Sequence, residues 1–200
     1  MKLLLVFLMM VLPLTAEIID RVAIAIGYQV ITASAIDEEL RVTALLNGKP
    51  IRLDESARRD AADRLVQQFL IRRDMLLSRY TVPDAADVDA YSRAVEQELG
   101  DPNQLAALLR QYGLSEAILR EHLALQLTTL RFVEFRFRPD LNVSDSDIQA
   151  YIQRQHLGDS VNKNRVRQAI VEERTDAALN AWLEGARKRA NIVYFDKTLQ

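Results

Sequence analysis

The spacing of apolar and polar residues along the chain predicts a helical protein framed by two short strand segments. Residues 22–26 form an apolar, largely β-branched run that Gly27 interrupts and residues 30–32 resume, which is typical of a strand, a tight turn and a returning strand. After this hairpin, apolar residues recur at steps of three and four, the spacing of buried helix faces. A lone hairpin is marginally stable in water, so the β-branched and aromatic run at 192–195 is the expected partner of the first strand.

Cap and break signals divide the helical part into about seven helices. Thr32 and Ser34 can both cap the first helix, and Ser34 and Asp37 have the spacing of a capping box. Ser144 opens a later helix with a capping box. Long helices are expected at about residues 54–79 and 165–190. The predicted fold is mainly α, with a small β-pairing between the N- and C-terminal strands. Candidate structural residues lie in these strands and in the two long helices: Ile24, Leu65, Phe69, Trp182 and Val193.

The first sixteen residues have a different pattern from the rest. Lys2 precedes an unbroken apolar stretch at residues 3–12, and Ala16 ends the segment, which together are typical of a secretory signal peptide. The stretch is shorter than the roughly 20 residues that cross a bilayer as a helix. We therefore expect a signal peptide at 1–16 and a periplasmic or otherwise secreted protein. An uncleaved membrane anchor and a buried first helix are the alternatives.

The amino-acid composition limits the kinds of catalytic and metal-binding site that the chain could form. The sequence has no Cys, which excludes disulfides and thiol chemistry, and it has only two His. Phosphate-binding loops, nucleophile elbows and suitably spaced carboxylate pairs are absent from the sequence, so no catalytic residue, metal ligand or cofactor is expected. Removing residues 1–16 takes away one of 26 basic side chains and leaves 25 against 28 acidic ones, a net charge of −3. This mildly acidic balance argues against general nucleic-acid binding.

One segment, LRFVEFRFRPD, interleaves aromatic and basic residues. It has three interpretations. In the first, the Phe rings enter the core at a helix end while Arg stems lie over them. In the second, the segment forms a basic-rimmed surface for peptides, where aromatic residues and Arg are favoured. In the third, the segment contacts a membrane surface. The candidate peptide-binding residues are Phe132, Phe135, Phe137, Arg136 and Arg138.

Four segments, taken in order, resemble the SurA-type periplasmic chaperones and their trigger-factor-like peptide-binding core. They are DRVAIAIGYQVITASAIDEEL, DRLVQQFLIRRDMLLSRYTVPDAADVDAY, YGLSEAILREHLALQLTTLRFVEFRFRPDLNVSDSDIQAYI and AALNAWLEGARKRANIVYF. Each segment alone is a weak signal, and their order makes the resemblance specific. Together they span nearly all of the chain after the expected signal peptide.

The resemblance has one large departure. In SurA-type proteins, one or two parvulin prolyl-isomerase domains lie between the helix that carries the Tyr, here Tyr151, and the C-terminal helix. About a dozen residues occupy that place here, RQHLGDSVNKNR, whereas a parvulin domain needs on the order of 90–100 residues. The resemblance therefore implies a single peptide-binding domain at 17–200, in which about 17–155 are completed by the helix and strand at about 165–196.

By this resemblance we expect a holdase chaperone that binds unfolded or nascent secreted polypeptides, such as outer-membrane proteins, without isomerase activity. One alternative is an adaptor in the cell envelope that binds one specific partner. Another is a member of the peptidyl-prolyl isomerase family with residual activity. We expect no nucleic-acid partner and no membrane contact after signal cleavage, and self-association is left open.

Overall fold

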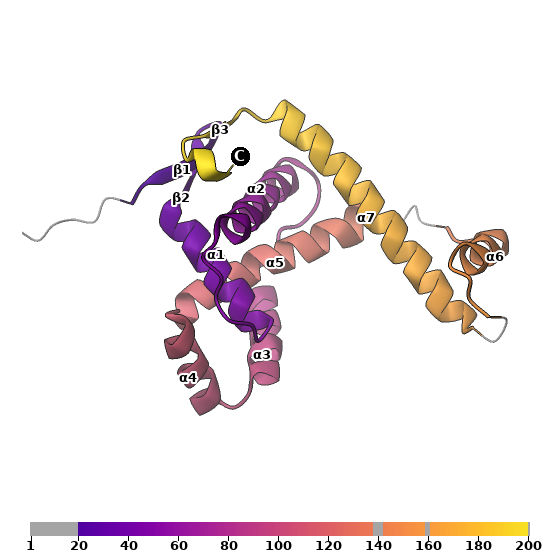
Figure 1. The fold of residues 1–200 in the computed structure, drawn as a ribbon, viewed down its shortest axis with the longest axis horizontal. Coiled ribbons are helices and arrows are strands. Elements are labelled where there is room, and N and C mark those ends of the chain that lie inside the picture. Colours follow the sequence, from indigo (N-terminus) through magenta and orange to yellow (C-terminus); the bar gives the residue numbers. More distant parts are fainter. Residues whose placement is uncertain (1–19, 138–141, 159–160, 200) are drawn as a thin grey trace, which may run out of the picture.

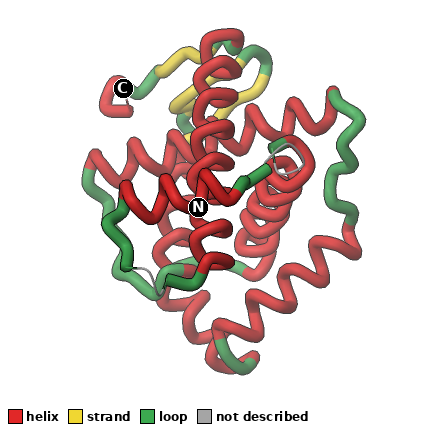
Figure 2. Tube along the Cα trace, turned by 90° about the vertical axis from the view of Figure 1, so that its right-hand side faces the viewer, coloured by secondary structure: helices red, strands yellow, loops and turns green. Residues whose placement is uncertain are grey.

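The computed structural model describes residues 20–137, 142–158 and 161–199, and in these ranges the protein is mainly helical, as predicted (Figure 1). Figure 2 shows the strands gathered at one end of the molecule. The expected signal peptide at 1–16 lies outside the described residues. The helices are α1 (Ala33–Leu46), α2 (Glu55–Leu77), α3 (Ala85–Leu99), α4 (Pro102–Tyr112), α5 (Glu116–Arg136), α6 (Asp145–Arg154) and α7 (Lys163–Arg189).

A three-stranded antiparallel sheet joins the two ends of the described chain. Its strands are β1 (Val22–Ile26), β2 (Gln29–Thr32) and β3 (Ile192–Tyr194), in the order β2-β1-β3. Gly27 makes the turn between β1 and β2 with a positive φ of 60°, a conformation that glycine adopts without strain. Its N–H also donates to the carbonyl of Asn191, 3.0 Å away. The predicted pairing of the first and last strands is therefore confirmed.

The start of α1 distinguishes between the two caps, Thr32 and Ser34, that the sequence allows. Thr32, the last residue of β2, is the N-cap, and its hydroxyl accepts a hydrogen bond from the N–H of Ala35 at 3.3 Å. Ser34 lies inside the helix, and its hydroxyl donates to the carboxylate of Asp20. The expected Ser34–Asp37 capping box is therefore wrong, because the strand runs directly into the helix and its final residue takes the cap position. The predicted capping box at Ser144 is confirmed.

The main core lies beneath the sheet, between α1 and α2. Ile24 is fully buried there, and Leu65 and Phe69 pack against it while partly exposed. Val193 sits opposite Ala25 in the sheet and stays 42% exposed, so it contributes to pairing more than to the core. A second core joins α1 to α4 and α5 through buried residues that are mostly Leu: Val42, Ala44, Leu45, Leu105, Leu109, Tyr112, Leu114, Leu119 and Leu123.

The long helix α7 connects the body to a projecting arm. Leu183 and Ala186, near its C-terminal end, are buried against the body, whereas Val166 and Ile170 form a separate small core with Ile148 of α6. In Figure 1 the arm, made of α6 and the start of α7, extends away from the other helices. None of the helices in the described ranges is both long and apolar enough to cross a membrane.

Candidate functional site

The aromatic segment at the end of α5 divides between core and surface. Phe132 is fully buried, its ring centroid 4.7 Å from that of Trp182 in α7 and 5.7 Å from that of Phe137. The guanidinium of Arg136 lies 5.9 Å from the centre of the Phe132 ring and 6.0 Å from that of Trp182. A cation at this distance over an aromatic face is attracted by the ring quadrupole. Ile71 and Met75 of α2 complete the aromatic cluster that these residues form.

The structure does not bring the three predicted Phe rings to one surface. Phe135 is 43% exposed and stacks on Tyr80, with ring centroids 6.2 Å apart, at the edge of the aromatic cluster. Phe137 is partly buried against Phe132, and Arg138 lies outside the described residues. The placement of Phe132 therefore matches the first interpretation of this segment, in which the rings enter the core and an Arg lies over them.

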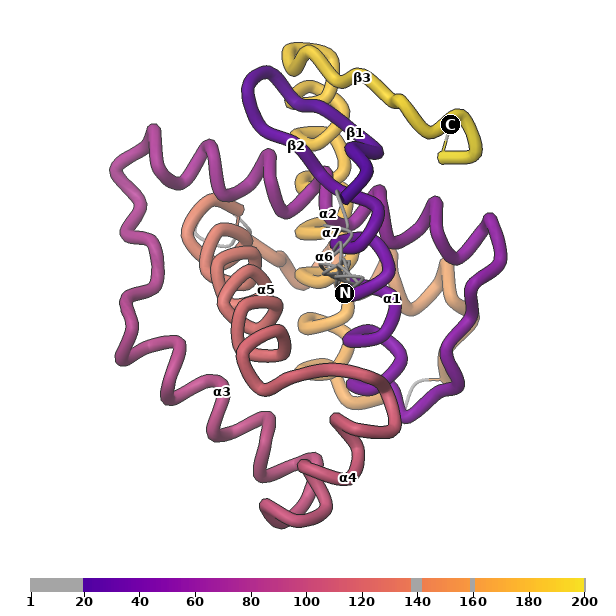
Figure 3. The backbone as a smooth tube through the Cα atoms, turned by 90° about the vertical axis from the view of Figure 1, so that its left-hand side faces the viewer, coloured from indigo at the N-terminus to yellow at the C-terminus, as the bar shows by residue number. Residues whose placement is uncertain are grey.

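A second apolar and basic site lies between the hairpin and α2, a region that the sequence reasoning did not select for binding. Figure 3 shows the hairpin above α2. The cavity between them has a volume of about 580 Å³, and we call it the hairpin groove. Its lining residues come from the hairpin turn and from one face of α2: Ile26, Gly27, Tyr28, Gln29, Phe69, Arg72, Arg73 and Leu76.

The helical repeat of α2 explains why these side chains gather there. The buried face of α2 carries Val66, Leu70 and Ile71, and the neighbouring face carries Phe69 and Leu76 at helical spacing. Leu76 is 64% exposed, although it is a large apolar residue. The available sequence signal was the excess of apolar positions in FLIRRDMLL, more than a single buried face requires.

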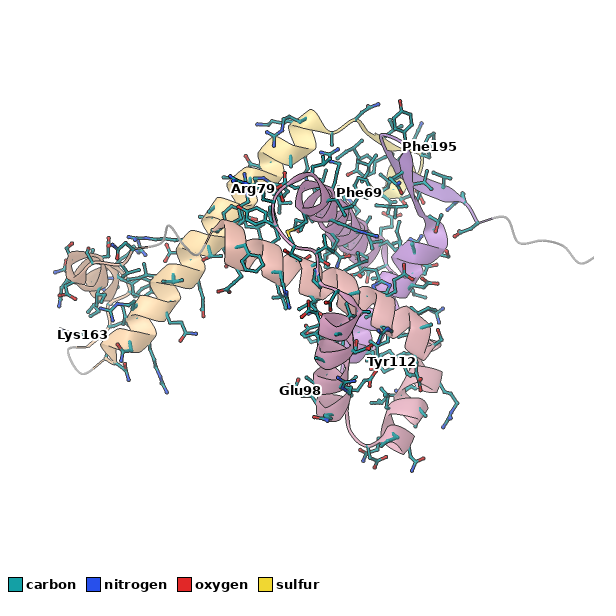
Figure 4. All side chains as sticks on the ribbon, turned by 180° about the vertical axis from the view of Figure 1, so that it is seen from behind. Phe69, Arg79, Glu98, Tyr112, Lys163 and Phe195 are labelled. Atoms are coloured by element: carbon teal, nitrogen blue, oxygen red, sulfur yellow. The ribbon has the colours of Figure 1, made fainter. Side chains whose placement is uncertain are left out.

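The charges at the groove are not compensated within the described residues. Arg72 and Arg73 line it, Arg79 follows just beyond the end of α2, and none of the three makes an ion pair or hydrogen bond with a described side chain. Leu77, beside them, is 82% exposed. In Figure 4, Phe69 and Arg79 mark this region, far from Lys163 at the end of the arm. The site therefore combines exposed apolar area with positive charge, the combination expected of a surface that binds polypeptides.

A buried polar cluster holds α1 against α2 and α5. The carboxylate of Glu39 accepts hydrogen bonds from Arg64 at 2.7 Å and Thr43 at 3.1 Å, and it lies 2.9 Å from Nδ1 of His122. Burial raises the pKa of Glu39, but the hydrogen bonds from His122 and Arg64 outweigh it and hold this pKa below its ordinary value. The described residues contain no group of three or more His, Asp or Glu that could hold a metal ion.

No protein-family model matches the chain. The chain is similar to the chaperone SurA. Chaperone SurA from Alkalilimnicola ehrlichii is 27% identical to it over 183 residues, which cover 88% of this chain and 41% of the SurA protein. The similarity thus extends over most of this chain, while the chain spans about two fifths of the length of that relative.

Proposed function

We propose that this protein is a holdase chaperone of the cell envelope, which binds unfolded polypeptides such as outer-membrane proteins and does not isomerise prolines. The observation that carries the proposal is the hairpin groove, an exposed apolar and basic site on a chain similar to SurA. Residues 1–16 would act as the signal peptide and 17–200 as the chaperone domain. The connection between α6 and α7, residues 155–162, is too short to hold a parvulin domain at that place in the chain.

The mechanism needs no covalent step. An unfolded client exposes apolar side chains, and burying them against Tyr28, Phe69 and Leu76 removes apolar surface from water. The guanidinium groups of Arg72 and Arg73, which have no ion-pair partner in the described part of the chain, can pair with client carboxylates or with aromatic rings. Binding then lowers the concentration of free unfolded chain by mass action, which slows aggregation without using an energy source.

Aggregation suppression tests the proposal directly. A denatured outer-membrane β-barrel protein and a denatured soluble protein are diluted into buffer with and without this protein, and light scattering is followed. We expect suppression of both clients, or of the β-barrel protein alone. No suppression of either client in molar excess of this protein would refute the holdase function.

A matched pair of variants assigns the activity to the hairpin groove. Leu76→Asn combined with Leu77→Asn removes apolar area in and beside the groove. Leu53→Asn removes a Leu before α2 that is 62% exposed, close to the 64% of Leu76. We expect the double variant to lose most of the suppression and Leu53→Asn to retain it. Equal activity of the two variants would place client binding elsewhere, and capture of a single folded envelope protein in place of unfolded clients would favour the adaptor function.

A further inference from the structure

We propose that a second cleft, between α1, α2 and α5, binds the main chain of extended polypeptides through glutamine side chains, with Gln68 at its centre. This inference rests on the proposed function in taking an unfolded polypeptide as the ligand. It adds a site that reads the peptide backbone, separate from the hairpin groove that accepts apolar side chains.

The cleft consists of two cavities that lie side by side. Their volumes are about 410 and 190 Å³, and Arg64, Gln68 and Gln126 line both of them. The larger cavity extends along α1 to Asn47, and the smaller one extends to Leu179 of α7. We call the pair the amide cleft. Its total size falls within the range of ligand pockets, about 300–1,000 Å³.

The amide groups of the cleft are available to a ligand. Gln67, Gln68 and Gln126 line it, and none of these side chains forms a hydrogen bond with any residue that the structure describes. The Oε1 atom of Gln68 is buried and has no hydrogen-bond partner among the residues that the structure describes. A buried carbonyl oxygen without a hydrogen-bond donor is unfavourable. Because this oxygen is already out of contact with water, it can accept a hydrogen bond from a ligand N–H with little further cost of desolvation.

The charges of the cleft indicate a neutral ligand. Glu39, at the larger cavity, is already bonded to Arg64 and His122, so it presents no free negative charge. The hydroxyls of Thr43 and Thr129 also line the cleft, and they already donate to Glu39 and to the carbonyl of Leu125. The other polar groups are side-chain amides, each of which has two N–H donors and a carbonyl acceptor. The same donor and acceptor pair recurs at every peptide group of an extended chain. The ligand class that matches this lining is therefore an uncharged, extended polypeptide segment recognised through its backbone.

Gln68→Leu tests the cleft with little risk to the fold. The substitution keeps a similar volume and removes a buried oxygen that has no partner, so the variant is expected to retain the stability of the wild type. The control is Gln111→Leu, which changes an exposed glutamine on α4 outside the amide cleft. Chemical denaturation followed by circular dichroism checks that both variants fold.

The binding experiment uses a fluorescein-labelled, ten-residue peptide of Ser, Thr and Ala, and the same peptide methylated on alternate backbone nitrogens. Fluorescence anisotropy measures affinity for the full chain. We expect the wild type and Gln111→Leu to bind the unmodified peptide about tenfold more tightly than the methylated one, as loss of backbone hydrogen bonds requires. Gln68→Leu should bind the unmodified peptide about tenfold more weakly than the wild type and should not distinguish the two peptides.

Two results would overturn the inference: equal affinity of Gln68→Leu and the wild type for the unmodified peptide, or equal discrimination between the two peptides by both proteins. The aggregation assay keeps this failure apart from failure of the holdase function. If the wild type suppresses aggregation while Gln68 has no effect on peptide binding, the holdase function stands and the amide cleft does not. If the wild type discriminates between the peptides through Gln68 but suppresses no aggregation, the amide cleft stands and the holdase function does not.

Discussion

The aromatic cluster and the hairpin groove are built from the same kinds of residue on two faces of α2, yet one is core and the other is surface. In the aromatic cluster, Phe132 and Trp182 contact each other, and Arg136 lies over both rings. In the hairpin groove, Tyr28 is fully exposed and Arg72 has no partner among the described residues. The difference is coverage, because α5 and α7 pack on one face of α2, whereas only the hairpin stands over the other.

This difference in burial indicates that the aromatic cluster stabilises the fold and that the hairpin groove binds a ligand. A buried aromatic side chain stabilises the fold by roughly 1.5–3 kcal/mol through burial alone. An exposed apolar side chain contributes little to stability and adds a risk of aggregation, so clustered exposed Leu residues indicate a binding surface. Substitutions in the aromatic cluster should therefore change stability, and substitutions at the hairpin groove should change client binding.

The largest effect is expected at the centre of the aromatic cluster. Phe132→Ala leaves a cavity between α2, α5 and α7 and should lower the free energy of unfolding by about 3–5 kcal/mol. Phe135→Ala, three residues later in the same helix and exposed, is the matched control and should cost under about 1.5 kcal/mol, since it loses mainly one ring contact. Urea denaturation measures both, and similar losses for the two variants would contradict the assignment of core and surface.

The next effect concerns charges and sharpens the same comparison, because Arg64 is bonded to buried Glu39 whereas Arg72 has no ion pair or hydrogen bond with any described side chain. Glu39→Gln should lower the free energy of unfolding by on the order of 2 kcal/mol at pH 7, since it weakens hydrogen bonds from Arg64 and His122. Glu38→Gln, at the neighbouring and less buried position, is the control and should stay near the wild-type value. A control that loses as much stability as Glu39→Gln would show that the buried cluster has no special role.

The same pair predicts a pH dependence. The pKa of Glu39 is lower in the folded protein than its ordinary value of 4.5, so the unfolded chain binds this proton more tightly. The stabilisation is therefore complete above about pH 4.5 and is lost as the pH falls through the folded-state pKa. Thermal melts from pH 7 to pH 3 should show the advantage of the wild type over Glu39→Gln shrinking in the acid range. An advantage that grows on acidification would contradict the direction of this pKa shift.

A smaller effect separates the two kinds of arginine. Arg136→Gln removes a guanidinium that lies over two rings and should cost about 0.5–1 kcal/mol. Arg73→Gln removes one without a described partner and should change stability by less than about 0.5 kcal/mol while weakening client binding at the hairpin groove. Parallel denaturation and aggregation assays compare the two variants. If Arg73→Gln destabilised the fold more than Arg136→Gln, the assignment of Arg136 to the core and Arg73 to the binding surface would be contradicted.

The smallest effect on stability is expected at Leu77, which is the most exposed Leu near the hairpin groove. Leu77→Asn should leave the free energy of unfolding within about 0.5 kcal/mol of the wild type, because little of the side chain is buried. Differential scanning calorimetry is sufficient to measure this. A marked drop in melting temperature would show that Leu77 packs in solution against part of the protein outside the described residues.

Most helices and strands of the fold can be predicted from the sequence, because the residue patterns that indicate them are local. The β-branched run before Gly27 and the apolar period of α2 each report the conformation of their own residues, and both predictions hold. The sequence allows both Thr32 and Ser34 as the cap of α1, and only the path of the chain out of β2 selects Thr32. The partner of the first strand was found by elimination, since 192–195 was the single remaining strand candidate.

The two sites are much harder to predict from the sequence, because they depend on how distant segments pack together. Local sequence determines which side chains share a helix face, so it places Phe132 and Arg136 together and puts Phe69 and Leu76 on one stripe of α2. That stripe is predicted to be buried throughout, which is wrong at Leu76, because its side chain is 64% exposed. Whether such a face meets another helix or water depends on packing between segments far apart in the chain. One face of α2 is part of the core because Trp182 in α7, fifty residues after Phe132, packs against that ring. The hairpin left the other partly uncovered, and only the tertiary structure decided that difference.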